Sequence, residues 1–153
     1  MKKFLKIIVT FLALTLFLVG CSLVTSEKNK TYRITKASMV DSVTVFYNDK
    51  SYVTKMVFKK QGLYNEKELE ERRVNMEKEY KSALSDDNQD MVIKSEMKNN
   101  VGELTVTVKV TDNTEFWLQM MLDRKDLFDK TGTHILLDKV ELALKDQDAI
   151  EVK

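Results

Sequence analysis

The sequence predicts an α+β protein: an antiparallel sheet of about five strands with two to three helices packed on one face, preceded by a signal-peptide helix. Three observations support this class. Residues 104–110 alternate strictly between apolar and polar, two pairs of apolar segments are separated by turns that contain Asn, and apolar residues recur at helical spacing between 65 and 84. The chain has 153 residues, enough for one domain, which we place at residues 31–153.

The first three strands are expected at residues 32–35, 39–47 and 52–60. Apolar residues lie on both faces of the second strand, which is typical of a strand in the interior of a sheet. Asn48 and Asp49 follow this strand, and both residue types tolerate a positive φ. The second and third strands are therefore predicted to form a hairpin.

A helix is predicted from Asn65 to about Leu84. Asn65 and Glu68 have the spacing of a capping box, in which each side chain accepts a hydrogen bond from the backbone N–H of the other residue. Glutamates crowd the start of the segment and lysines lie near its end, as the helix dipole favours. We interpret these charges as a solvated face. The core face is expected to carry Leu69, Met76, Tyr80, Ala83 and Leu84.

A second hairpin is predicted from residues 91–97 and 103–110. Asn99 and Asn100 supply its turn. The second of these strands has one apolar and one polar face, so one face of the sheet should be buried and the other solvated.

The remaining residues are predicted to form helices at 114–128 and 136–147, separated by a break at 130–133. The first of these segments is apolar nearly all round, so it is either fully buried or exposes a patch for a partner. We interpret Trp117 as a core residue and keep a partner-binding helix as the alternative.

The first segment of the chain has the features of a signal peptide. Lys2, Lys3 and Lys6 form a positively charged start, and residues 7–20 are uncharged and mostly apolar. As a helix, these 14 residues would rise about 21 Å, which is shorter than the roughly 30 Å hydrocarbon core of a bilayer. We therefore expect residues 1–20 to be a signal that is removed rather than a permanent span.

The end of this segment, Leu18-Val19-Gly20-Cys21, resembles the lipobox of bacterial lipoproteins. The chemistry requires a thiol that takes a diacylglyceryl group as a thioether, and a small residue before it, so that cleavage falls between Gly20 and Cys21. Acyl chains such as palmitate then anchor the protein stably. We expect a lipid on Cys21, a flexible tether over residues 21–30, and a domain at the bacterial cell membrane that faces outside the cytoplasm. The alternative is a secreted protein with an incidental cysteine.

Composition excludes several classes of function. The 25 Lys and Arg residues balance 24 Asp and Glu residues, which argues against nucleic acid as a partner. A single Cys excludes a disulfide framework and a cysteine-built zinc site, and a single His leaves little scope for metal chemistry. We accordingly predict no metal and no cofactor.

Four features of residues 32–153 stand out together: Val53-Thr54-Lys55, the acidic start of the first helix, the strand Leu104-Thr105-Val106-Thr107-Val108 and the closing Ile150-Glu151-Val152-Lys153. With these features and the order of its elements behind the lipobox, the chain resembles the YehR-like family of small bacterial lipoproteins. The family usually has a glycine in its first hairpin turn, where this chain has Asn48-Asp49-Lys50-Ser51. The resemblance implies an extracytoplasmic α+β lipoprotein, in a family without an established biochemical activity.

Candidate metal sites are few. The acidic loop at residues 86–90 suggests calcium, but Met91 and Met97 stand where an EF-hand loop has Gly and Glu, so we interpret the loop as a turn. His134 has no second His to share a metal and is interpreted as a surface or capping residue. Three carboxylates at every third position are interpreted as a polar helix face: Asp123, Asp126 and Asp129.

No nucleophile elbow and no glycine-rich phosphate loop occur in the sequence, so we expect no catalytic residues and no enzyme. We predict a binding or interaction module of the cell envelope, held at the membrane by the lipid on Cys21, with a protein or small-molecule partner. The alternative is a lipid-tethered hydrolase that uses a carboxylate pair. A shallow groove on the exposed sheet face is one candidate site, lined by four tyrosines: Tyr32, Tyr47, Tyr52 and Tyr64.

Overall fold

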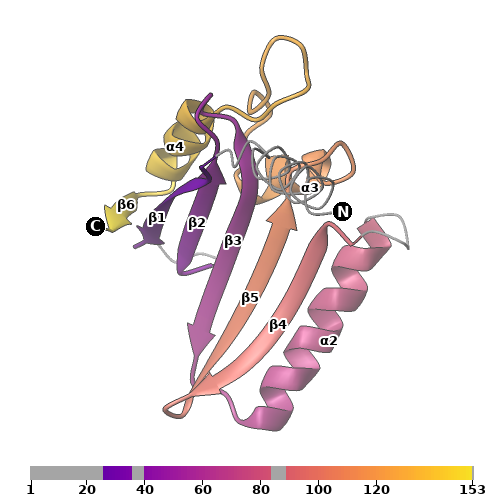
Figure 1. Cartoon of the computed structure of the whole chain (residues 1–153). Coiled ribbons are helices and arrows are strands. Elements are labelled where there is room, and N and C mark those ends of the chain that lie inside the picture. Colours follow the sequence, from indigo (N-terminus) through magenta and orange to yellow (C-terminus); the bar gives the residue numbers. More distant parts are fainter. Residues whose placement is uncertain (1–25, 36–39, 84–88, 153) are drawn as a thin grey trace, which may run out of the picture.

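A computed structural model describes residues 26–35, 40–83 and 89–152. These residues form one six-stranded antiparallel sheet, in the order β4-β5-β3-β2-β1-β6, together with three helices (Figure 1). The α+β class is confirmed, with one strand more than predicted. The predicted signal peptide and the Gly20–Cys21 cleavage site lie outside the described residues. Within the described ranges, no helix is both long enough and apolar enough to cross a bilayer.

β1 (Lys28–Ile34), β2 (Ser42–Tyr47) and β3 (Val53–Gly62) are neighbours in the sheet. β1 begins four residues earlier than predicted, so residues 28–30 pair with β2 instead of belonging to the tether. This stretch has no apolar residue, and backbone hydrogen bonding to β2 is what makes it a strand. The predicted hairpin of β2 and β3 is confirmed.

The turn between β2 and β3 differs from the prediction. Ser51 has the positive φ, 62°, that was expected at Asn48 or Asp49. Asn48 acts through its side chain instead: its Oδ1 accepts hydrogen bonds from the backbone N–H groups of Lys50 and Tyr52, at 2.9 and 3.1 Å. Asparagine has thus shaped the turn by a local hydrogen bond rather than by a left-handed backbone.

β4 (Met91–Lys98) and β5 (Val101–Lys109) form the second predicted hairpin. Asn99 and Asn100 have φ angles of 50° and 64°. Two successive left-handed residues are what a two-residue type I′ turn requires, and Asn tolerates them. The predicted turn residues are confirmed.

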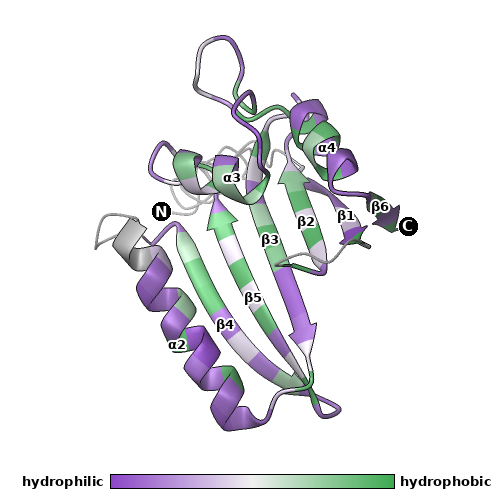
Figure 2. Ribbon diagram, turned by 180° about the vertical axis from the view of Figure 1, so that it is seen from behind, coloured by the Kyte–Doolittle hydropathy of each residue, from purple (hydrophilic) through white to green (hydrophobic). Residues whose placement is uncertain are grey.

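α2 (Glu66–Ala83) matches the predicted helix closely. The N–H of Glu68 donates to Oδ1 of Asn65 at 2.9 Å, and the N–H of Asn65 donates to Oε2 of Glu68 at 3.1 Å, so the capping box is confirmed. Leu69 and Tyr80 are buried against the sheet. Figure 2 shows most of the remaining helix surface as hydrophilic, in agreement with a solvated face.

α3 (Glu115–Met121) is shorter than the helix predicted at 114–128. The backbone of Asp123 has a φ of 49°, which ends the helical path. Leu122 and Leu127, which the sequence pattern placed in the helix, are instead buried from a loop. Burial of these two leucines outweighs the helical propensity of the segment.

α4 (Leu137–Asp146) agrees with the last predicted helix, but the chain then returns to the sheet. β6 (Ala149–Val152) pairs with β1 and is the sixth strand. Asp148, with a φ of 57°, makes the turn between α4 and β6. The sequence Ala149-Ile150-Glu151-Val152 does not alternate strictly between apolar and polar residues, so periodicity gave no signal for this strand.

The core lies where one face of the sheet meets residues from all three helices. Trp117 of α3 is 1% exposed, and its ring makes edge contacts with Phe58 of β3 and Tyr80 of α2, with centroid separations of 5.3 and 5.4 Å. The core interpretation of Trp117 is therefore confirmed. The strand residues that alternate with the core residues point to the opposite side of the sheet, which we call the open face.

Candidate functional site

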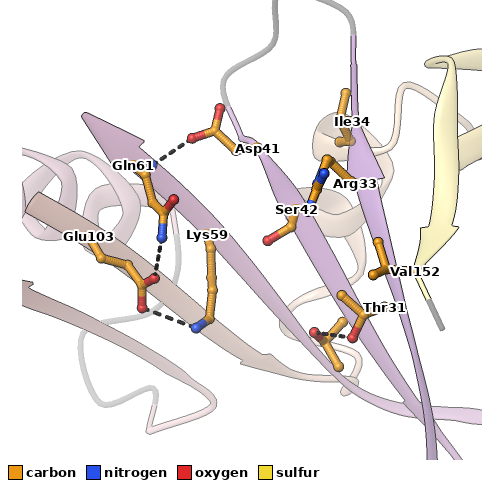
Figure 3. A pocket seen from close by; sticks show the side chains of 10 residues that line it. Thr31, Arg33, Ile34, Asp41, Ser42, Lys59, Gln61, Glu103 and Val152 are labelled. Atoms are coloured by element: carbon orange, nitrogen blue, oxygen red, sulfur yellow. Dashed lines mark hydrogen bonds and ion pairs between the residues drawn. The ribbon is translucent and has the colours of Figure 1, made fainter. Parts of the chain in front are cut away.

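A pocket of about 650 Å³ lies on the open face. Figure 3 shows its side chains; the polar ones that lie within the strands come from neighbouring strands and point to the same side of the sheet, whereas Ile34 belongs to the core face. The polar lining residues are Thr31 and Arg33 of β1, Ser42 and Thr44 of β2, Lys59 and Gln61 of β3, and Glu103 of β5.

Strand register brings these side chains together. Arg33 lies opposite Ser42, which lies opposite Lys59 on its other side. Gln61 lies opposite Glu103. Residues directly opposite one another in an antiparallel sheet point to the same face, with Cβ atoms about 5 Å apart. Residues distant in the sequence thus form one polar surface.

Glu103 anchors one side of the pocket. Its side chain is buried, with 7% of the residue exposed, and its carboxylate accepts hydrogen bonds from Lys59 Nζ at 3.0 Å and Gln61 Nε2 at 2.9 Å. Burial alone raises the pKa of a carboxyl group, but here the hydrogen bonds from Gln61 and Lys59 outweigh it and hold the pKa of Glu103 below its usual value. Glu103 is therefore ionised at neutral pH.

Asp41 closes another side of the pocket. Its carboxylate accepts hydrogen bonds from the backbone N–H of Gln61 at 2.6 Å and from Lys60 Nζ at 2.8 Å. Its own backbone N–H donates to the carbonyl oxygen of Lys59 at 2.7 Å. These bonds fix Asp41 to β3, so its carboxylate serves the framework of the pocket.

Arg33 differs from the other charged lining residues. Within the part of the chain that the structure describes, its guanidinium forms no ion pair or hydrogen bond, and the side chain is exposed. The hydroxyl groups of Thr31 and Thr44 lie nearby, 3.0 Å from each other. A guanidinium with its hydrogen-bond donors available suits a carboxylate or phosphate, and adjacent hydroxyls suit further polar groups of a ligand.

The four tyrosines do not line a common groove, contrary to the prediction. Tyr32 is buried on the core face, where its hydroxyl donates to Glu141 at 2.7 Å. Tyr52 stacks on His134, and the ring of Tyr64 lies under Arg72. The register of β1 puts its threonine and arginine, rather than its tyrosine, on the open face.

The three aspartates predicted to share a helix face do not share one, because α3 ends before them. Asp126 pairs with Arg124 at 2.6 Å and Lys139 at 3.2 Å, and their hydrogen bonds, chiefly that of Arg124, lower the pKa of Asp126 to about 2. Among the described residues, no group of three or more His, Cys, Asp or Glu side chains is placed to hold a metal ion. Residues 86–88 of the acidic loop lie outside them.

His134 lies on the surface, in the loop between α3 and α4. Its Nδ1 is 3.2 Å from Oδ2 of Asp129, and its ring stacks on Tyr52 with a centroid separation of 4.2 Å. Asp129 also accepts the hydroxyl of Thr131 at 2.7 Å, and this bond is the main cause that lowers the pKa of Asp129 to about 2. The contact between His134 and Asp129 holds the loop together.

Sequence reasoning missed every polar residue of the pocket. The alternation of polar and apolar residues in β5 indicated a solvated face, but Lys59 and Glu103 are 44 positions apart in the chain. The strand register that joins them is set by nonlocal pairing, which one sequence does not reveal.

No family model matches the sequence, and no curated protein is significantly similar to it. Among solved structures, the NMR structure of the E. coli YehR protein is similar: 14% sequence identity, a TM-score of 0.59, and coverage of 86% of this chain and 94% of that chain. The NMR structure of a protein from Streptococcus pneumoniae TIGR4 is similar at 12% identity with a TM-score of 0.50, covering 86% of this chain and 88% of that chain. The chain therefore has a YehR-like fold.

Proposed function

We propose that this protein is a YehR-like bacterial lipoprotein. Residues 1–20 are the signal peptide, cleavage falls between Gly20 and Cys21, and the lipid on Cys21 holds the domain at the cell membrane, outside the cytoplasm. Two independent features support this proposal: the Leu18-Val19-Gly20-Cys21 motif after an apolar segment too short to span, and the YehR-like fold of the domain.

We further propose that the domain is a binding module whose ligand occupies the pocket on the open face. The observation that carries this is the exposed Arg33 guanidinium, which has no protein partner among the described residues and lies beside the pocket hydroxyls. Its chemistry favours a small polar ligand that bears a carboxylate or phosphate group, because Arg binds such groups through two parallel hydrogen bonds.

The rival function, a lipid-tethered hydrolase, needs one carboxyl group that stays protonated at neutral pH. Two carboxylates line the pocket, those of Asp41 and Glu103. Hydrogen bonds hold the pKa of Glu103 below its usual value, and Asp41 is bound to the backbone of β3. This arrangement favours binding over acid catalysis.

The anchor is tested by the substitution Cys21→Ser. The parent protein should incorporate a labelled fatty acid in cells, and the substituted protein should accumulate as an unprocessed precursor without the label. Label on the Cys21→Ser protein would show that the lipid is elsewhere and that the lipobox interpretation is wrong.

The pocket is tested by thermal unfolding of the full chain in detergent, with panels of small carboxylic acids, sugar phosphates and neutral sugars. A ligand that binds the folded state raises the unfolding temperature. A stabilising acid should lose its effect in Arg33→Gln and keep it in Arg72→Gln, which removes an exposed arginine of α2 that does not line the pocket. Equal loss in both variants would contradict binding at Arg33.

The natural ligand is sought with a photo-crosslinking residue in the tethered protein in cells. Thr44 and Thr107 offer a matched pair, since both are half-buried threonines on the open face, and only Thr44 lines the pocket. Adducts formed at position 44 and absent at position 107 identify molecules held in the pocket. The same adducts at both positions would indicate nonspecific contact with the sheet.

A further inference from the structure

One end of the sheet holds both the start of the described chain and α3. The first residue of β1, Lys28, lies opposite Tyr47 at the end of β2, and Tyr47 lies opposite Val53 at the start of β3. β5 ends at the same end of the sheet, because its last residue, Lys109, lies opposite Lys55 near the start of β3. Figure 1 shows α3 at this end, beside the tip of β5. We call it the tether end.

Hydrogen bonds fix the start of the described chain at the tether end. Ser26 donates to the carboxylate of Asp49 at 3.3 Å, in the β2–β3 turn. Glu27 accepts the hydroxyl of Thr54 at 2.7 Å and pairs with Lys55 at 3.1 Å. The place where the chain enters the domain is therefore defined.

The length of chain between Cys21 and this entry point is short. Ser26 is the fifth residue after Cys21, so their Cα atoms are at most about 18 Å apart in any conformation. The ten residues of β3 extend over about 33 Å. A lipid on Cys21 thus holds the tether end next to the bilayer. Because the sheet is longer than this stretch of chain, its opposite end can point away from the bilayer.

α3 presents an apolar pair to solvent at this end. Trp117 and Leu118 are buried in the core, whereas Phe116 and Met120, one helical turn apart on the opposite side of the helix, are 72% and 54% exposed. Exposed Asp112 and Asp123 flank the helix. Exposed Lys125 follows Asp123, so charges of both signs border the pair, and the contact that the pair itself can make is apolar.

We propose that Phe116 and Met120 insert into the interface of the bilayer that carries the lipid on Cys21. α3 is then a second membrane contact that orients the domain, as partly buried aromatic and apolar side chains do at lipid interfaces. This inference depends on the lipid anchor proposed above. The orientation has a consequence for binding: Arg33 lies near the end of β1 remote from the tether, so the pocket is held away from the bilayer.

The test uses the full lipidated chain, reconstituted in vesicles of phosphatidylethanolamine and phosphatidylglycerol. An environment-sensitive fluorophore is attached to Phe116→Cys or, as a matched control, to Leu63→Cys, an 88% exposed apolar residue just beyond the remote end of β3. The chain has one natural cysteine, whose thiol is blocked by the thioether. The probe at 116 should show a blue shift and quenching by brominated lipids, the probe at 63 should show neither, and Met120→Gln should reduce quenching at 116.

The outcomes separate this contact from the anchor. If the protein stays on the vesicles with Cys21 blocked, but the probe at 116 shows no blue shift and no quenching by brominated lipids, the α3 contact is overturned and the anchor stands. If the two probes are quenched equally, the orientation is overturned. If Cys21 itself reacts with the fluorophore and the protein leaves the vesicles, the anchor fails and the contact fails with it. Unfolding midpoints of both cysteine variants, expected to match the parent, show that the fold is intact.

Discussion

Lys59 and Glu103 join neighbouring strands across the open face, with Lys59 Nζ 3.0 Å from Glu103 Oε1. The two residues are diagonal rather than opposite, since Lys59 faces Thr105 and Glu103 faces Gln61. The long lysine side chain reaches along the sheet to the carboxylate, and Gln61 supplies a second hydrogen bond. A buried carboxylate is stable in the ionised form only with such donors, so Lys59 and Gln61 keep Glu103 ionised.

Glu103 should make the stability of the domain depend on pH below its usual pKa. The folded protein lowers the pKa of Glu103 from 4.5, so its contribution is fully present above that value and is lost as the pH falls toward the lower folded pKa. Glu103→Gln should lower the free energy of unfolding by about 1–3 kcal/mol at neutral pH. It should also lose less stability than the parent between about pH 5 and pH 3. Urea unfolding at each pH measures both effects.

The control for this prediction is Glu71→Gln, which removes an exposed glutamate whose ion pair with Lys67 is 3.9 Å long. This variant should follow the acid profile of the parent, because an exposed pair contributes little. Identical acid profiles for Glu103→Gln and the parent would contradict the assigned charge state of Glu103.

Trp117→Ala should be strongly destabilising. The side chain is fully buried between Phe58 and Tyr80, and removal of such a ring costs about 3–5 kcal/mol. Trp117→Phe should cost less, because it keeps most of the packing and removes an indole N–H that has no hydrogen-bond partner among the described residues. Denaturant unfolding measures both variants. A water-exposed emission maximum for this single tryptophan, with an unchanged unfolding curve in Trp117→Ala, would overturn the core assignment.

The elements that the sequence predicted well depend on local chemistry. The α2 capping box involves two residues three positions apart, and the Asn99-Asn100 turn needs only two residues that tolerate a left-handed backbone. Both are readable from a short window. The first hairpin was also predicted, although the left-handed residue proved to be Ser51 because Asn48 forms a side-chain turn instead.

The elements that the sequence predicted poorly depend on distant contacts. Residues 122–128 have a helical pattern, but Leu122 and Leu127 enter the core from a loop. β6 is a strand because the edge of β1 is available to it. The pocket is lined by Arg33 of β1 and Glu103 of β5, and only the order and register of the strands place both residues on its wall. Periodicity within one segment carries no information on these pairings.

Gly102→Ala should destabilise the junction of α2 and the sheet. A Cβ at this position would lie 2.8 Å from Cδ2 of Tyr64 and 3.0 Å from Cδ1 of Leu69, closer than packed atoms approach. Such overpacking costs about 1–3 kcal/mol. The cost should shrink in a Tyr64→Ala background, since the two residues compete for one volume. Unfolding free energies of the four proteins in this double-mutant cycle test the clash, and additive costs would contradict it.

Ser51→Gly should stabilise the domain. Ser51 has a φ of 62°, and its backbone is held in place because its N–H donates to the Asn48 carbonyl at 2.9 Å and its carbonyl accepts from Leu137 N–H at 3.0 Å. A left-handed backbone costs a non-glycine residue about 1–2 kcal/mol. Glycine removes that cost but loses about 0.4–1 kcal/mol through the greater freedom of the unfolded chain, so the net gain should be about 0.5–1 kcal/mol.

Lys50→Gly is the matched control in the same turn: Lys50 does not have a positive φ, so only the unfolded-state cost applies and this variant should be destabilised. Denaturant unfolding of the three proteins measures both changes in the free energy of unfolding. A gain with Ser51→Gly and a loss with Lys50→Gly would place the backbone strain at Ser51. A loss with both glycines would show that the turn stores no such strain.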